Sequence, residues 1–190
     1  MAEEDYQKNI LKALNVDLKP SSARLLDWSC QSDKELYPGA HIATGEDGPG
    51  NHYHHGIVLD NTGRMEIVHF WGENKNTAKI QTTTLPAFVA GSPSLVGIKT
   101  RPLYLIRYDD DNEQKRQETV SRAKKALKEA DKYKYDLLSN NCECLAFYCR
   151  AGDWTSEQAD KVQEAINRLI KTITEMAKAS VNASSGVFKK

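Results

Sequence analysis

Apolar and polar residues alternate along the middle of the chain, which is the pattern of β-strands that bury one face. The clearest case is a hairpin, in which HHGIVL (54–59) and MEIVHFW (65–71) are joined by the turn residues of DNTGR. Two further strands are predicted within ELYPGAHIATG (35–45) and PLYLIRY (102–108). The stretch 72–101 has scattered Thr, Gly and Pro and predicts a long loop with one weak strand.

Toward both ends the apolar spacing changes to steps of three and four, which is typical of amphipathic helices. This spacing predicts helices over 5–15 and 112–133. A long helix is predicted after Thr155, because Thr155 and Gln158 match the spacing of a capping box. The order of helices, strands and helices predicts an α+β fold, with a small antiparallel sheet packed against helices.

The chain divides into an N-terminal helical extension (1–34), a central domain (35–152) and an amphipathic C-terminal helix with a tail (153–190). The last helix carries one apolar seam, formed by Ala159, Val162, Ile166, Leu169, Ile173 and Met176. Its other side has charges of both signs, whereas a helix in a membrane interface is mostly basic there. We predict that the seam packs on its own domain; pairing with a second copy of the chain ranks next, and membrane contact last.

Charge and composition exclude several classes of protein. Lys and Arg number 26, as do Asp and Glu, so the formal net charge is zero and no global field attracts nucleic acid. No apolar run reaches the roughly 18 residues of a membrane-spanning helix, and the polar start MAEEDYQKNI does not resemble a secretory signal. We therefore predict a cytoplasmic protein without a transmembrane segment, whose four cysteines are thiols.

Cys142 is the strongest candidate for chemistry. It lies in NNCECLAFYCRAG (140–152), which predicts a short apolar helix with Asn141 as N-cap and Gly152 just past its end. In the first turn of such a helix, unpaired N–H groups and the helix dipole favour a nucleophilic thiolate. The alternative is a small core residue, because free cysteine packs as a hydrophobe.

The other three cysteines receive no catalytic role. Cys144 lies about 200° around the helix from Cys142 and should face away from it. Cys149 is on the same side as Cys142 but two turns deeper, and Cys30 is isolated.

A nucleophilic thiolate also needs a base and a group that orients the base. Strand alternation places His54 and His55 on opposite faces of the hairpin, and pairing of the two strands brings His69 near His54. His54 is therefore predicted to be the base, and His69 the partner that hydrogen-bonds its far ring nitrogen. His55 is interpreted as an outer-face residue and His52 as a loop residue.

Zinc binding is the competing interpretation of the histidines. The spacings H-x-H-H and C-x-C do not match common structural zinc sites, and adjacent strand residues cannot easily ligate one ion. His41 could line the same sheet but receives no role. We predict neither a metal nor a cofactor.

The segments HHGIVLD, IVHF and NNCECLAFYC, in this order after the Pro-Gly turn of ELYPGAHIATG, resemble the lecithin–retinol acyltransferase-like family. This family is a permuted branch of the NlpC-type papain-like thiol enzymes, and the similarity covers roughly residues 35–152. The resemblance implies a permuted papain-like core with Cys142 as nucleophile, His54 as base and His69 as third member. It also implies acyl transfer through a Cys142 thioester, from a glycerophospholipid to water, an amine or an alcohol.

The chain departs from the family pattern at two places. Cys144 and Leu145 stand where the family motif continues with His and Phe, and the last helix is charged where many animal members have a hydrophobic anchor. The implied partner is a phospholipid or other acyl donor, with peripheral membrane contact at most. Two other functions stay open: a papain-like amidase or peptidase, and a non-enzymatic binding module that retains the fold. An apolar groove would favour a lipid, and backbone hydrogen-bond partners would favour a peptide.

Overall fold

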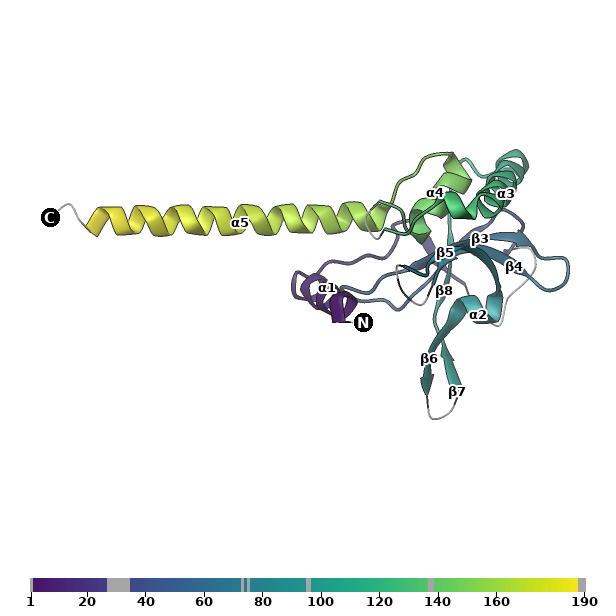
Figure 1. The fold of residues 1–190 in the computed structure, drawn as a ribbon, viewed down its shortest axis with the longest axis horizontal. Coiled ribbons are helices and arrows are strands. Elements are labelled where there is room, and N and C mark those ends of the chain that lie inside the picture. The colour runs from purple at the N-terminus through teal and green to yellow at the C-terminus, as the bar shows by residue number, and fades with distance from the viewer. Residues whose placement is uncertain are drawn as a thin grey trace.

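The structure is a computed structural model that describes residues 2–26, 35–72, 74, 76–94, 97–136 and 139–187. Its elements form the predicted α+β fold (Figure 1). In chain order they are α1 (Ala2–Ala13), β1 (Ala23–Leu25), β2 (His41–Thr44), β3 (His54–Asp60), β4 (Glu66–Trp71), β5 (Lys79–Thr84), α2 (Leu85–Val89), β6 (Ala90–Ser94), β7 (Gly97–Thr100), β8 (Leu103–Ile106), α3 (Glu113–Lys128), the 3₁₀ turn η2 (Ala130–Lys132), α4 (Cys142–Ala151) and α5 (Glu157–Val187). Cys30 lies outside the described residues.

One antiparallel sheet organises the fold. Its strand order is β1-β8-β2-β3-β4-β5, and β3 and β4 form the predicted hairpin, with Ile57 opposite Val68. The prediction of a long loop at 72–101 is wrong, because β5, α2 and the two-stranded sheet β6-β7 lie within it. β5 (KIQTTT) is an edge strand that buries only Ile80, so its hydrophobic pattern is too weak to predict a strand.

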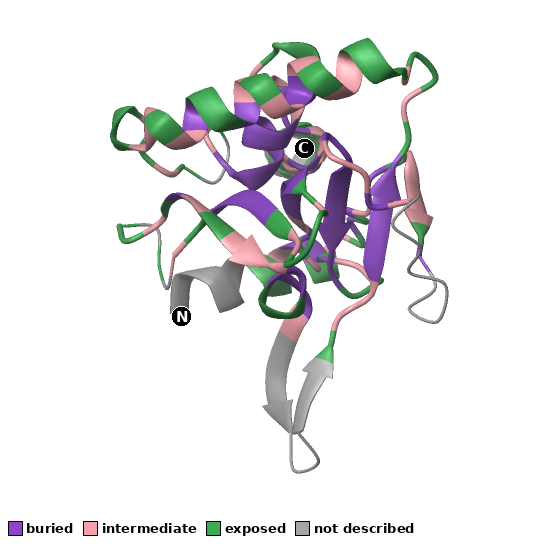
Figure 2. Cartoon of the chain, turned by 90° about the vertical axis from the view of Figure 1, so that its right-hand side faces the viewer, coloured by how far each residue is buried: buried purple, intermediate pink, exposed green. Residues whose placement is uncertain are grey.

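Helices cover both faces of this sheet. On one face, α3 and α4 pack against the side chains of Ile57 and Val68. On the other face, Val58 and Ile67 contact Phe88 and its neighbours in the α2 region. Figure 2 shows the buried residues concentrated in the sheet and beneath the helices. The alternation of faces along β3 is the one that the sequence pattern predicts.

α5 is 31 residues long and projects from the rest of the molecule (Figure 1). Its first turns pack as predicted, because Val162 and Ala165 contact Leu11 and Leu18. The prediction is wrong for the rest of the seam: the 12-residue α1 is too short to cover it, and Met176 is 64% exposed.

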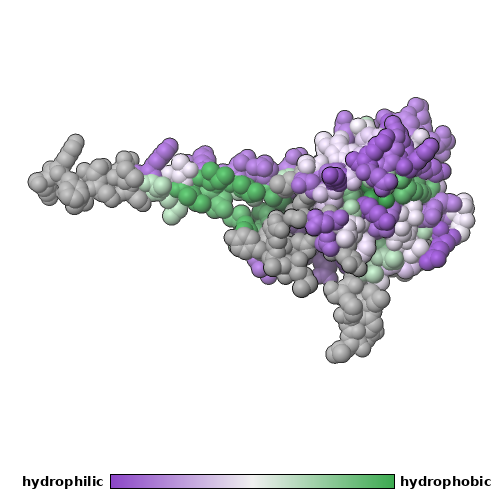
Figure 3. Space-filling model, viewed as in Figure 1, coloured by the Kyte–Doolittle hydropathy of each residue, from purple (hydrophilic) through white to green (hydrophobic). Residues whose placement is uncertain are grey.

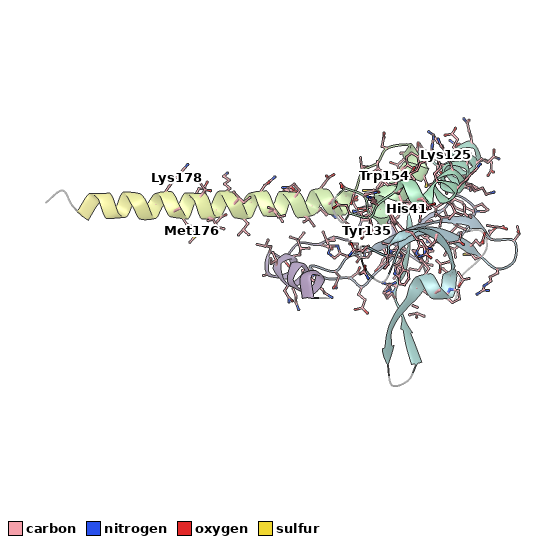
Figure 4. All side chains as sticks on the ribbon, in the orientation of Figure 1. His41, Lys125, Tyr135, Trp154, Met176 and Lys178 are labelled. Carbon is pink, nitrogen blue, oxygen red and sulfur yellow. The ribbon has the colours of Figure 1, made fainter. Side chains whose placement is uncertain are left out.

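The exposed part of α5 is amphipathic. Figure 3 shows an apolar stripe along one side of the helix, and in Figure 4 Met176 and Lys178 point away from each other. The exposed apolar side chains are Ile166, Leu169, Ile170, Ile173 and Met176. In the part of the chain that the structure describes, every helix is too short or too polar to cross a membrane.

Candidate functional site

Cys142 is the first residue of α4, as predicted. The side-chain oxygen of Asn141 accepts hydrogen bonds from the backbone N–H groups of Glu143 and Cys144, both at 2.9 Å. Gly152 ends the helix in the left-handed conformation, with φ of 90°, which favours glycine. The cap and the C-terminal glycine therefore fix both ends of a short helix that carries Cys142 at its positive end.

The Cys142 thiol is almost fully buried, with 8% of the residue exposed. Its Sγ lies 3.9 Å from the carbonyl oxygen of Tyr53, which is the acceptor for the S–H group. Burial raises the pKa of Cys142 to about 12, although the backbone N–H groups of His55, Cys142 and Glu143 act in the opposite direction. The resting state is therefore a neutral thiol, held against the start of β3.

His54 and His69 are hydrogen-bonded to each other, with 2.7 Å between His54 Nε2 and His69 Nδ1. The register that pairs Gly56 with His69 brings the two rings together across the hairpin. Phe88 packs against both rings, at centroid distances of 5.1 and 6.0 Å. A Cβ atom at Gly56 would lie 2.9 Å from the Phe88 ring, so the glycine makes room for this contact.

Both histidines are uncharged at neutral pH. Burial lowers the pKa of His69 to about 4. The pKa of His54 is also well below its usual value, because the ring is shielded from water and because a proton on it would be repelled by Arg101 and by any proton on His69. Since His54 uses Nε2 to bond His69, its Nδ1 is the ring nitrogen that can accept a proton from another group.

Among the described residues, the structure does not bring the Cys142 sulfur into contact with the His54 or His69 ring. His54 and His69 share the α2 face of the sheet, whereas α4 lies on the opposite face. The thiol contacts the backbone on either side of His54, through Tyr53 O and the N–H of His55. Catalytic hydrogen bonds often tighten only when substrate is bound, but transfer of the thiol proton to His54 also requires that the His54 ring and the Cys142 sulfur be brought into contact.

His55 is a buried core residue, so its interpretation as an outer-face residue is wrong. It has no exposed surface, because α4 covers the face of β3 toward which it points. Its Nδ1 lies 2.9 Å from His41 Nε2, and His41 Nδ1 in turn lies 2.7 Å from the Tyr108 hydroxyl. Burial lowers the pKa of His55 to about 3 and also holds the pKa of His41 well below its usual value. This second histidine pair is therefore uncharged at neutral pH. His52 lies on an exposed loop, as predicted.

Gln158 and Ser156 join the start of α5 to this site. Ser156 Oγ accepts from the N–H of Ala159 at 3.0 Å and caps α5, so the predicted capping box of Thr155 and Gln158 is wrong. Gln158 instead points inward, and its Nε2 lies 3.0 Å from His55 Nε2. Its pattern in the sequence is that of an ordinary capping residue, which gives no sign of this contact.

Glu143 completes the polar network behind Cys142. Its Oε2 accepts from Ser156 Oγ at 2.5 Å and from the backbone N–H of Gln158 at 2.9 Å. Its Oε1 lies 3.9 Å from His55 Nε2, and this contact is not an ion pair while His55 is neutral. Burial raises the pKa of Glu143, while the hydrogen bonds from Ser156 and Gln158 lower it.

A small cavity adjoins Cys142, with a volume of about 40 Å³. This is room for only a few water molecules. Tyr135, Ala159 and Val162 contribute its apolar lining, and His52 and Gln158 are among the polar lining residues. Within the described ranges, no group of three His, Cys, Asp or Glu side chains is arranged to hold a metal ion.

A family model described as "Lecithin retinol acyltransferase" matches residues 34–155, which is more than half of the chain. The chain belongs to this family. The match includes His54, His69 and Cys142 and ends before Ser156. No curated protein and no solved structure matches the chain.

The two residues that depart from the family motif are core residues here. Cys144 and Leu145 are each 1% exposed, and Leu145 packs in the cluster between α4 and the sheet. Burial raises the pKa of Cys144. Cys144 is therefore a neutral packing residue, and the described cysteines are all free thiols.

Proposed function

We propose that the protein is a cysteine-dependent acyltransferase or phospholipase A-type hydrolase that acts on a glycerophospholipid. Cys142 Sγ attacks the acyl carbonyl carbon while His54 takes the thiol proton. His54 then gives this proton to the departing oxygen, so that a lysophospholipid leaves and an acyl thioester remains on Cys142. Water, an amine or an alcohol attacks the thioester, and its proton returns through His54 to the Cys142 sulfur.

The observation that carries this proposal is the 2.7 Å bond between His54 and His69, together with the contacts of the Cys142 sulfur with the backbone on either side of His54. A base must be uncharged to accept a proton, and burial keeps both rings neutral. His69 fixes the orientation of His54 through Nε2 and leaves Nδ1 for the thiol. Membership in an acyltransferase family supports acyl transfer as the general chemistry.

The buried thiol implies a particular order of events. A thiolate and an imidazolium are costly in a dry site, so the resting enzyme holds a neutral thiol and a neutral imidazole. We therefore propose that proton transfer accompanies attack on the carbonyl carbon. Charge then develops only when a substrate is in place.

The lining of the cavity suits a lipid acyl chain, but the cavity is too small to hold one. Tyr135, Ala159 and Val162 offer apolar contacts, which favour hydrocarbon. Because a volume of about 40 Å³ cannot hold an acyl chain, the chain must displace some of these walls when it binds. We propose that the loop bearing His52 and the segment bearing Tyr135 move, since both lie outside the sheet and α4.

The test is to incubate the full chain with a mixed phospholipid extract and to measure its intact mass. We expect an adduct with the mass of a fatty acyl group, which neutral hydroxylamine removes as it does thioesters. Cys142→Ser should abolish this thioester, and Cys149→Ser is the matched control that should retain it. A thioester that persists in Cys142→Ser would refute the proposed nucleophile.

The same protein should then be incubated with a peptide and isopeptide library. Cleavage that requires Cys142, without a lipid adduct, would favour an amidase or peptidase. If neither substrate class reacts, the binding-module interpretation replaces the enzymatic one.

A further inference from the structure

Gln158 lies outside the family-matched segment, yet it makes three contacts at the Cys142 site. Its Oε1 accepts from the backbone N–H of Tyr53 at 2.8 Å, and its Nε2 donates to the carbonyl oxygen of Tyr53 at 3.2 Å. Nε2 also lies 3.0 Å from Nε2 of His55. With 6% of the residue exposed, these contacts are shielded from water and hold Tyr53 and His55, at the entry to β3, in place.

The same two residues, Tyr53 and His55, contact the Cys142 sulfur. The carbonyl oxygen of Tyr53 is the acceptor of the Cys142 S–H group, at 3.9 Å from Sγ. The backbone N–H of His55 points to the same sulfur. Gln158 therefore binds the two residues that flank His54 in the chain and that surround the thiol.

The position of Gln158 is itself tied to the nucleophile. Its backbone N–H donates to Glu143 Oε2 at 2.9 Å, and Glu143 follows Cys142 in α4. Ser156 Oγ donates to the same oxygen. The start of α5, the start of α4 and the start of β3 are thus joined in one closed ring of contacts around Cys142.

We infer that Gln158 is a positioning residue of this site, an inference that rests on the proposed role of Cys142 as nucleophile. It holds the Tyr53 carbonyl and the His55 N–H at the sulfur. By donating to the Tyr53 carbonyl it also weakens that oxygen as an acceptor for S–H, so the thiol loses its proton more readily. Removal of the Gln158 amide should therefore stabilise the neutral thiol.

The experiment measures the rate at which iodoacetamide alkylates Cys142 in the full chain at several alkaline pH values, with mass spectrometry to locate the label. Gln158→Met keeps the side-chain length without polar atoms, and Gln158→Glu keeps the acceptor for Tyr53 but lacks the amide donors. Loss of such a hydrogen bond should slow alkylation by about fivefold to tenfold at a given pH. Gln163→Met is the matched control: Gln163 is exposed on α5, where its amide donates to Asn167, and this variant should leave the rate unchanged.

A purely structural role would give a different result, so unfolding temperatures are measured for each variant. If both Gln158 variants fold and alkylate like wild type, whatever their unfolding temperatures, the positioning role is refuted. If only one variant folds, its alkylation rate decides the question. Alkylation needs no lipid, so slower labelling would support the positioning role even if the wild-type protein forms no thioester. A wild-type thioester together with unchanged labelling would leave the proposed function intact and reject the role of Gln158.

Discussion

Acid should destabilise this protein strongly, because its fold buries three uncharged histidines, His41, His55 and His69, and partly buries a fourth, His54. Burial lowers the pKa of each ring, to about 3 for His55 and about 4 for His69. In the unfolded chain a histidine has a pKa of about 6.5. The unfolded state therefore binds more protons between pH 6.5 and these lower values, and the free energy of unfolding falls as the pH falls through this window.

The size of the effect follows from the pKa values of His55 and His69 in the folded and unfolded states. At pH 5, about 1.5 units below the unfolded pKa, each of His55 and His69 reduces the free energy of unfolding by about 2 kcal/mol relative to pH 8. Together they account for about 4 kcal/mol, and His41 and His54 act in the same direction. Glu143 opposes them, because its raised pKa makes the folded state bind the extra proton. A net loss of several kcal/mol is a large fraction of the roughly 5–15 kcal/mol of a typical domain.

Urea unfolding followed by circular dichroism at a series of pH values between 8 and 5 measures this loss. His55→Gln should be less stable than wild type at pH 8, yet its free energy of unfolding should fall by about 2 kcal/mol less on acidification. His52→Gln, at an exposed position, is the matched control and should follow the wild-type curve. A wild-type free energy that stays constant from pH 8 to pH 5 would show that the histidines are not buried as neutral groups.

Two further predictions concern the histidines and the last helix. His54→Ala should lose nearly all thioester formation, and His69→Ala should lose somewhat less, since the proton acceptor matters more than its orienting partner. Equal activity of His54→Ala and wild type would exclude His54 as the base. His55→Ala should instead lower the free energy of unfolding by about 2 kcal/mol, because it breaks buried hydrogen bonds. The free energy of unfolding of a chain that ends at Asp153 should be about 3 kcal/mol lower than that of a chain that ends at Asn167, since only the longer chain keeps the contacts of the first α5 turns. Equal urea midpoints would mean that these turns do not stabilise the fold.

Features that depend on near neighbours in the sequence were predictable. The turn residues of DNTGR pair β3 with β4, and strand alternation then brings His54 and His69 together. Asn141 and Gly152 bound α4 through local cap chemistry. The catalytic roles of Cys142, His54 and His69, and the division of the chain into three parts, stay predictions that the thioester and truncation experiments address.

Features that depend on distant contacts were not predictable. His55 and Gln158 are 103 positions apart, and no local pattern in either segment reveals that they meet. The alternation along β3 places His55 opposite His54 but does not show that α4 covers that face. A histidine is polar, so its place on a strand does not by itself predict burial. His55 is buried because α4 packs over that face of β3.

The site also extends further along the chain than the family match does. The matched segment ends at residue 155, whereas the capping hydroxyl of Ser156 and the amide of Gln158 bind Glu143 and Tyr53, which lie within that segment. A helix that begins with such contacts cannot shift at its first turn without moving the residues around Cys142. The packing of α5 therefore helps to set the geometry around Cys142. A comparison of family members over the matched segment alone would omit Ser156 and Gln158, which make this connection.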